Sequence, residues 1–239
     1  MTNPNRKATY RVRLRFQKHG IMRFVGHLDM MRFFQKSIRR AGLPIAYSNG
    51  FHPHQIMSFA LPLGIGITSD GEYMDLELSE DVSGKKSLDR LNAEMADGVR
   101  ILSWSRLPDS AKKAMAAVEA AEYRVELEIF SPVDWQEAIR SFYKESDAIM
   151  ILKKTKKSER LLDLKPLIHD FRVEEETDDK VSFYVMLSAG STDNIKPELV
   201  FSHFLETYNV TDTAKIRRIH RLDLLGKDET GRFISLGDI

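Results

Sequence analysis

The sequence predicts an α+β protein built from two tandem ferredoxin-like halves, each a βαββαβ unit with an antiparallel sheet. Stretches with a two-residue hydrophobic period alternate with stretches that have the three- and four-residue period of a helix. The order strand, helix, strand, strand, helix, strand occurs twice, and we place the halves at residues 1–108 and 109–239. A chain of 239 residues has room for two domains of roughly 100–120 residues.

The first half is predicted from its hydrophobic periodicity. Residues 9–18 alternate apolar side chains with arginines, which predicts a strand with one buried face. Residues 27–41 repeat apolar side chains every three or four positions and predict a helix, which Gly42 ends. The remaining elements expected here are short extended segments at 45–47 and 56–61, a strand at 72–78, a helix at 85–95 and a strand at 99–107.

The second half repeats this order after a connection at 110–120, whose Ala- and Lys-rich composition predicts a helix. The expected elements are a strand at 123–130, a helix at 132–145, a strand at 148–153, a basic loop at 153–160, a hairpin of 171–176 with 180–188, a helix at 196–208 and a strand at 216–225. The halves share no visible sequence identity, so the repeat is inferred from element order alone.

The composition excludes several classes of protein. Hydrophobic residues make up 42% of the chain, too many for a disordered protein. The chain has no cysteine, which excludes a disulfide framework, a thiolate zinc site and an iron–sulfur cluster held by thiolates. The glycine-rich stretch at 63–71 lacks both the GxGxxG and the P-loop pattern, which argues against a nucleotide cofactor. We therefore expect no cofactor and no metal.

The sequence also predicts a cytoplasmic protein without a membrane partner. No stretch approaches the ~20 apolar residues of a membrane span. The N-terminus lacks the apolar core of a signal peptide.

Basic residues are concentrated at the start of the chain. Residues 1–60 contain eleven Lys and Arg but one acid, Asp29, which gives this segment a net charge of +10. The whole chain carries +1. A dense basic segment is typical of a surface that binds phosphate groups. The alternative is that it packs against acidic residues of the same chain, of which residues 70–81 contain six.

Eight of these cations are candidates for contacts with nucleic acid: Arg11, Arg13, Arg15, Arg23, Arg32, Lys36, Arg39 and Arg40. The three on the first strand lie opposite its apolar face, where sheet-based readers of single-stranded RNA bind their ligand. A second interpretation is that cross-strand pairs with Asp75 and Glu77 occupy these arginines. The four on the predicted helix have only Asp29 as an acidic neighbour on that helix and are either solvated or bound to phosphate.

The loop at 48–55 combines histidines, an aromatic residue, a glycine and a proline, with Tyr47 just before it. Long loops of this kind often carry function. We expect a substrate or partner pocket formed by His27, Asp29, Tyr47, Ser48, Phe51, His52 and His54. The three histidines are also candidates for acid–base catalysis, because imidazole titrates near neutral pH. Their simplest interpretation is hydrogen bonding within the loop, and the spacing of His52 and His54 is weak evidence for a metal site.

Several stretches of the chain are characteristic: Arg23-Phe-Val-Gly-His-Leu-Asp29, Arg39-Arg-Ala-Gly-Leu-Pro-Ile-Ala-Tyr-Ser48, Gly50-Phe-His-Pro-His54, Ser58-Phe-Ala-Leu-Pro-Leu-Gly64 and Glu72-Tyr-Met-Asp75. Together they resemble the radical-SAM-linked protein family, a bacterial domain of unknown function that is fused to, or encoded beside, radical SAM proteins. The resemblance implies a radical SAM protein as partner and a link to RNA or ribosome metabolism, but it assigns no catalytic residues. The missing cysteines agree with cluster chemistry located on the partner.

The predicted function is that of an accessory module that binds RNA, or presents an RNA-bearing substrate, to a radical SAM partner and does not act as an enzyme on its own. One alternative is a metal-independent RNA-processing enzyme that uses His27, His52 or His54. The other is a protein–protein adaptor for the radical SAM partner, without affinity for RNA.

Overall fold

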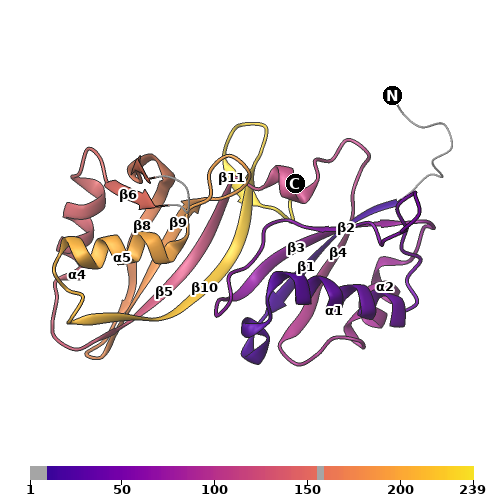
Figure 1. The fold of residues 1–239 in the computed structure, drawn as a ribbon, viewed down its shortest axis with the longest axis horizontal. Coiled ribbons are helices and arrows are strands. Elements are labelled where there is room, and N and C mark those ends of the chain that lie inside the picture. Colours follow the sequence, from indigo (N-terminus) through magenta and orange to yellow (C-terminus); the bar gives the residue numbers. More distant parts are fainter. Residues whose placement is uncertain (1–9, 155–158) are drawn as a thin grey trace. The chain divides into compact units, whose positions relative to one another are not determined.

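Strands and helices alternate along the chain in the mixed α+β fold that the sequence predicts (Figure 1). The computed structural model describes residues 10–154 and 159–239. The chain divides into unit 1, Met1–Val118 with Asp223–Ile239, and unit 2, Glu119–Leu222. This division differs from the expected halves because the C-terminal residues return to unit 1.

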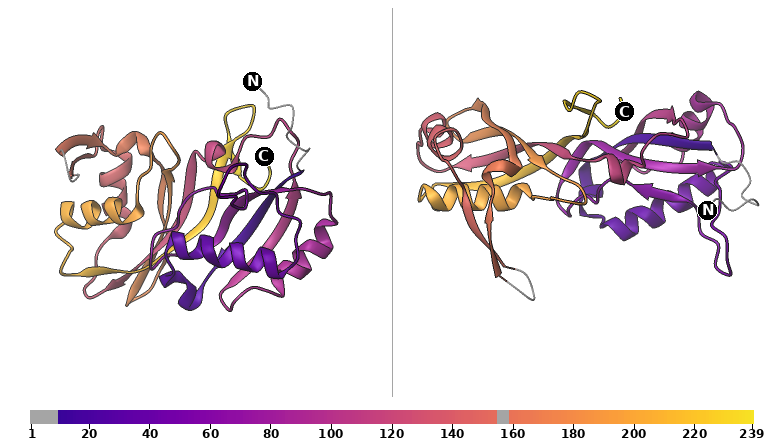
Figure 2. Two further views of the ribbon diagram at one scale, coloured as in Figure 1. Left: turned by 45° about the vertical axis from the view of Figure 1, so that its right-hand side comes forward. Right: turned by 90° about the horizontal axis from the view of Figure 1, so that it is seen from above.

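Unit 1 combines antiparallel strands with two longer helices that lie on one face of the sheet (Figures 1 and 2). Its elements are β1 (Tyr10–Lys18), a 3-10 turn (Gly20–Phe24), α1 (His27–Arg40), β2 (Met57–Phe59), β3 (Thr68–Leu78), α2 (Gly84–Asn92), β4 (Val99–Arg106), α3 (Ala114–Ala117), the end of β10 (Ala214–Lys227) and β11 (Phe233–Ser235). The strands are ordered β4-β1-β3-β10, with β2 also paired to β3 and β11 paired to β10. The helix expected at 110–120 is limited to the four residues of α3.

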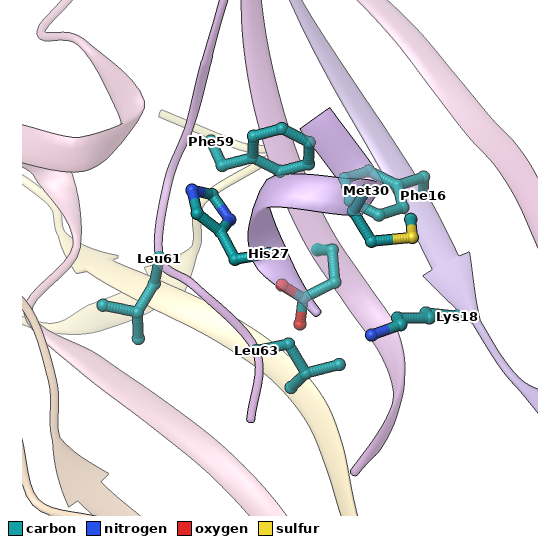
Figure 3. Close-up of a pocket in the computed structure, with 8 residues that line it drawn as sticks. Phe16, Lys18, His27, Met30, Phe59, Leu61 and Leu63 are labelled. Carbon is teal, nitrogen blue, oxygen red and sulfur yellow. The ribbon is translucent and has the colours of Figure 1, made fainter. Parts of the chain in front are cut away.

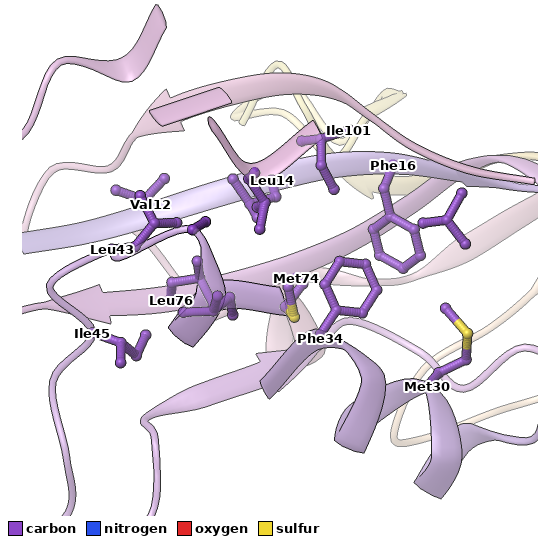
Figure 4. Close-up of a cluster of buried hydrophobic side chains, with 14 of the residues drawn as sticks. Val12, Leu14, Phe16, Met30, Phe34, Leu43, Ile45, Met74, Leu76 and Ile101 are labelled. Carbon is purple, nitrogen blue, oxygen red and sulfur yellow. The ribbon is translucent and has the colours of Figure 1, made fainter. Parts of the chain in front are cut away.

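The core of unit 1 lies between this sheet and helices α1 and α2 (Figure 4). The alternation along β1 places Leu14 and Phe16 on the helix side, where both are at most 2% exposed. Phe34 of α1 meets Phe16 edge to face, with ring centroids 4.9 Å apart. Burying a Leu or Phe side chain stabilises a fold by roughly 1.5–3 kcal/mol, so this contact fixes α1 on the sheet.

The register of β1 against β3 places the arginines of β1 on the opposite face of the sheet. Leu14 pairs with Met74 on the core side, and Arg13 pairs with Asp75 on the far side. Chain segments around Lys112 and Leu236 reach this far face, because the carbonyl oxygens of both residues accept hydrogen bonds from Arg13. The far face is therefore covered at Arg13.

Unit 2 also combines antiparallel strands with helices. Its elements are β5 (Ala120–Ile129), α4 (Trp135–Ile139), a π-helical turn (Arg140–Lys144), β6 (Met150–Lys154), β7 (Glu159–Asp163), a 3-10 turn (Lys165–Leu167), β8 (Ile168–Glu176), β9 (Lys180–Ser188), α5 (Pro197–Thr207) and the first part of β10. The strands are ordered β10-β5-β9-β8. Strands β8 and β9 are neighbours, as the sequence predicts for the hairpin of 171–176 with 180–188.

One part of unit 2 differs from the prediction. Strand β6 pairs with β7 in a separate two-stranded sheet, whereas the sequence predicts a basic loop at 153–160. This hairpin projects from unit 2 in the right-hand view of Figure 2. Residues 155–158 of the predicted loop lie outside the described residues. In the part of the chain that the structure describes, no helix is long and apolar enough to cross a membrane.

Candidate nucleic-acid interface

Helix α1 carries three basic side chains on its outer side. Met30 and Phe34 bury the inner side of the helix against the sheet. Arg32, Lys36 and Arg39 are four and three residues apart, so they lie on neighbouring turns away from the core. All three are exposed, as the helical periodicity predicts.

The loop that follows α1 is closed by its own hydrogen bonds. Tyr47 and Gln55 form a β-bridge at its base. The Ser48 amide donates to the His54 carbonyl (2.8 Å), and the Ser48 hydroxyl shares a hydrogen bond with His54 Nδ1, also at 2.8 Å. Gln55 Nε2 donates to the carbonyl oxygen of Gln35 on α1 (3.1 Å). These bonds hold the loop against the helix.

Helix α1 and the loop enclose an open groove of about 670 Å³, which we call the basic groove. Its lining residues are Arg32, Gln35, Lys36, Arg39, Tyr47, Pro53, His54 and Gln55. Three of these are cations and none is a carboxylate. A cleft lined by charges of one sign raises the local concentration of oppositely charged ligands. The basic groove is therefore suited to an anionic ligand.

The cations of the basic groove are available to a ligand. No described residue forms an ion pair with Lys36 or Arg39. Arg32 Nη1 lies 3.3 Å from Asp29 Oδ1, but both side chains are about two-thirds exposed (70% and 67%). An exposed pair of this kind contributes about 0–1 kcal/mol, so a phosphate group can replace Asp29 at little cost.

Two other predicted cations do not line the groove. Arg40 lies one position further round the helix, and its Nε is 2.6 Å from Glu94 Oε2. Arg23 places its guanidinium over the ring of Phe24, 4.6 Å from the centroid. We therefore leave both out of the basic groove.

The prediction that Arg13 contacts nucleic acid needs correction. Its side chain is 2% exposed, and Arg13 Nε donates to Asp75 Oδ1 at 2.8 Å. Its Nη atoms donate to the carbonyl oxygens of Leu236 (3.0 Å) and Lys112 (2.9 Å). With every nitrogen engaged and the side chain buried, no atom is left for a phosphate. Arg13 instead follows the second interpretation given by the sequence, in which a cross-strand pair with Asp75 occupies the arginine.

The other two arginines of β1 are also held within unit 1. Arg11 Nη1 donates to the Ala111 carbonyl at 2.8 Å. Arg15 Nη2 lies 3.4 Å from Asp223 Oδ2. Asp223 also accepts a hydrogen bond from the Tyr73 hydroxyl at 2.7 Å, and burial raises the pKa of Tyr73, so the phenol stays protonated as the donor. Arg15 is thus part of the attachment of the C-terminal segment.

His27 lies in a different cavity from the loop histidines (Figure 3). This pocket of about 280 Å³ is lined by Phe16, Lys18, His27, Met30, Phe59, Leu61, Leu63 and Glu72. The His27 ring meets Phe59 edge to face, with centroids 5.2 Å apart. The structure therefore separates His27 from His54, which the sequence placed in one pocket.

The remaining predicted pocket residues are distributed over the surface. Asp29 pairs with Arg32, and Ser48 orients His54 from within the loop. Phe51 is fully exposed, and His52 is exposed without lining any of the cavities described. Within residues 10–154 and 159–239, no cluster of three or more His, Asp or Glu residues is arranged to hold a metal ion.

A third cavity, the polar pocket, lies beside the basic groove and encloses about 530 Å³. Its lining residues are Arg11, His54, Gln55, Ile56, Met57, Ser58, Asp75, Leu76, Glu77 and Lys113. Sequence reasoning did not select Gln55 or Lys113. Helical spacing from Arg32 predicts that Gln35 and Lys36 lie near it on α1, whereas Lys113 reaches the pocket through chain folding that no local pattern indicates.

The comparison with protein families places the chain in a known group. The model of a family described as an uncharacterized protein conserved in bacteria, DUF2344, matches residues 11–197. The chain belongs to the DUF2344 family. The match includes both the basic groove and the polar pocket of this DUF2344 protein. No curated protein matches the chain.

Solved structures resemble this DUF2344 protein at low identity. A chain of a Cbf5-Nop10-Gar1 complex matches 92% of it with a TM-score of 0.52 and 12% identity, over 51% of that chain. A chain of an H/ACA RNP bound to a substrate RNA matches 89% of it with a TM-score of 0.46 and 12% identity, over 46% of that chain. The DUF2344 chain thus spans about half the length of these chains, and the likeness concerns the fold alone.

Proposed function

We propose that this protein binds single-stranded RNA in the basic groove and presents it to a radical SAM partner protein, without catalysing a reaction on its own. The observation that carries the RNA part is the basic groove, in which three cations and no carboxylate line one cavity. Arg32 and Arg39 are seven residues apart, about 10 Å along the helix, so the three cations can contact successive phosphates of one strand.

Exposed aromatic side chains beside the groove favour a single-stranded ligand. Tyr47 lines the groove and is 51% exposed, and Phe51 is fully exposed on the same loop. Unpaired bases stack on aromatic rings, and each such contact contributes about 1–3 kcal/mol. The bases of a duplex are already stacked and leave these rings without a partner.

The dependence of affinity on salt tests the RNA part. Each phosphate contact with a single strand contributes about −0.7 to the slope of log affinity against log salt, so three contacts predict a slope of about −2. Fluorescence anisotropy with a labelled RNA oligomer, from about 50 to 300 mM salt, measures it. Absence of binding at the lowest salt would contradict the proposal.

The partner part is supported by the family resemblance and by an exposed apolar patch. Ile21, Phe24 and Leu28 are 78%, 59% and 62% exposed, and Ile65 is 69% exposed. The loop that carries Ile65 is held to the 3-10 turn by a hydrogen bond from the Gly66 amide to the Arg23 carbonyl, at 2.8 Å. Contiguous exposed apolar side chains mark protein–protein contacts. The patch is therefore the surface we assign to the radical SAM protein.

Polar substitutions in this patch test the partner part. A Phe24→Ser/Leu28→Ser variant is expected to weaken the complex with the radical SAM protein at least tenfold, because buried aromatic and aliphatic anchors dominate interface energies. Size-exclusion chromatography and calorimetry with the purified partner measure this effect. The matched control is Phe130→Ser, since Phe130 is equally exposed (60%) but lies in unit 2. Equal losses in both variants would contradict the assignment.

His54 is the observation that favours the enzyme alternative. It lines both the basic groove and the polar pocket, and Ser48 fixes its Nδ1, which leaves Nε2 for a ligand. RNA recovered intact after incubation with chelator agrees with binding alone, and cleaved RNA favours the enzyme. A stable partner complex without RNA affinity favours the adaptor.

We also infer that both units are ferredoxin-like. In a βαββαβ unit of this type the strands lie in the order fourth, first, third, second. The order β4-β1-β3-β2 in unit 1 and the order β10-β5-β9-β8 in unit 2 follow this scheme. The separate hairpin of β6 and β7 is then an insertion between the first helix and second strand of unit 2.

A further inference from the structure

Two buried polar atoms of residues that line the polar pocket have no hydrogen-bond partner among the described residues. They are Arg11 Nη2, a donor, and Gln55 Oε1, an acceptor. Both residues line the polar pocket, and Gln55 as a whole is only 8% exposed. Buried polar groups are almost always hydrogen-bonded, so a donor and an acceptor left open at one cavity point to a ligand that offers both.

The other lining residues narrow the class of ligand. Lys113 adds a second cationic donor, and Asp75 and Glu77 add carboxylates, which oppose a free phosphate group. Met57 and Leu76 supply apolar walls. A planar molecule with carbonyl acceptors and N–H donors on its edge and apolar faces fits this lining, and a nucleobase has these properties.

The polar pocket and the basic groove share two lining residues. His54 and Gln55 line both cavities. The groove lies on the α1 side of unit 1, and the pocket includes Arg11 and Glu77, which pair with each other on the far side of the β1–β3 sheet. The segment that begins at His54 therefore forms the wall between the basic groove and the polar pocket. An RNA strand held in the groove is within reach of the pocket.

We propose that the polar pocket receives one base of the RNA that lies in the basic groove and selects a base with a carbonyl group. This proposal rests on the proposed function. Turning a base out of a single strand costs less than extracting it from a duplex. Guanine, uracil and cytosine each offer both a carbonyl acceptor for Arg11 or Lys113 and an N–H donor for Gln55. Adenine has no carbonyl and offers the cations only its ring nitrogens as acceptors.

Binding of two short RNA oligomers tests the inference. One oligomer contains only adenosine, and the other has a single guanosine at its centre. Wild-type protein is expected to bind the second oligomer about tenfold more tightly in anisotropy titrations. Lys113→Gln and Arg11→Gln are each expected to reduce this preference at least threefold and to leave affinity for the adenosine oligomer within twofold.

A neighbouring lysine supplies the matched control. Lys112 is exposed like Lys113 but does not line the pocket, so Lys112→Gln is expected to keep the full preference. No binding of either oligomer by wild-type protein would overturn the proposed function. Equal affinity for both oligomers, or a preference that persists in both pocket variants, would overturn the inference alone.

Discussion

A Lys36→Glu/Arg39→Glu variant is expected to bind single-stranded RNA about a hundredfold more weakly than the wild-type protein at about 0.1 M salt. A hydrogen bond with a charged partner contributes about 1.5–3 kcal/mol, and two lost contacts correspond to roughly two orders of magnitude in affinity. Both side chains are exposed and form no ion pair with a described residue, so the fold is expected to be unchanged. Anisotropy titrations measure the loss, and circular dichroism checks the fold.

The control for this prediction has the same change in net charge at a distance from the groove. Lys86→Glu/Arg100→Glu reverses two exposed cations of α2 and β4, neither of which lines the groove. Its affinity is expected to stay within about threefold of wild type, since exposed charges beyond the Debye length are screened. If the control loses as much affinity as the groove variant, binding depends on net charge and the basic groove has no special role.

The exposed face of α1 could be predicted from the sequence, because it depends on local periodicity. Arg32, Lys36 and Arg39 recur at helical spacing, so their common exposure follows from the sequence alone. The pairing of Arg40 with Glu94 was not predictable in this way, because 54 residues separate the two. Charge counts along the chain cannot tell which cations are already paired, and only the tertiary fold settles it.

The same distinction applies to the fold. The strands β1, β3, β8 and β9 lie where the sequence predicts strands, at 9–18, 72–78, 171–176 and 180–188, because hydrophobic alternation is a local pattern. The return of Asp223–Ile239 to unit 1 was missed, since it depends on long-range bonds such as that of Tyr73 with Asp223. The β6–β7 hairpin was missed because a basic composition suggests a solvated loop, whereas Leu152 pairs with Leu161 across the two strands.

An Arg13→Met variant is expected to destabilise unit 1 by about 3–5 kcal/mol. Methionine fills much of the space of the arginine but leaves Asp75 as a buried carboxylate without a cation. Of its side-chain bonds with described residues, Asp75 then keeps the one from the Ala114 amide, at 2.7 Å. Urea unfolding measures the effect in a Trp135→Phe background, because the chain has two tryptophans and Trp104 then reports on unit 1 alone.

A second substitution separates loss of packing from loss of charge compensation. In Arg13→Met/Asp75→Asn the buried site is neutral, and asparagine Oδ1 can still accept from the Ala114 amide. The double variant is therefore expected to regain about 1–3 kcal/mol relative to Arg13→Met, as residues that contact each other are coupled to this extent. A double variant that is less stable than Arg13→Met would show that Asp75 matters for its hydrogen bonds and not for its charge. An Arg13→Met variant within about 1 kcal/mol of wild type would mean that water reaches this site, and Arg13 would return to the candidate ligand surface.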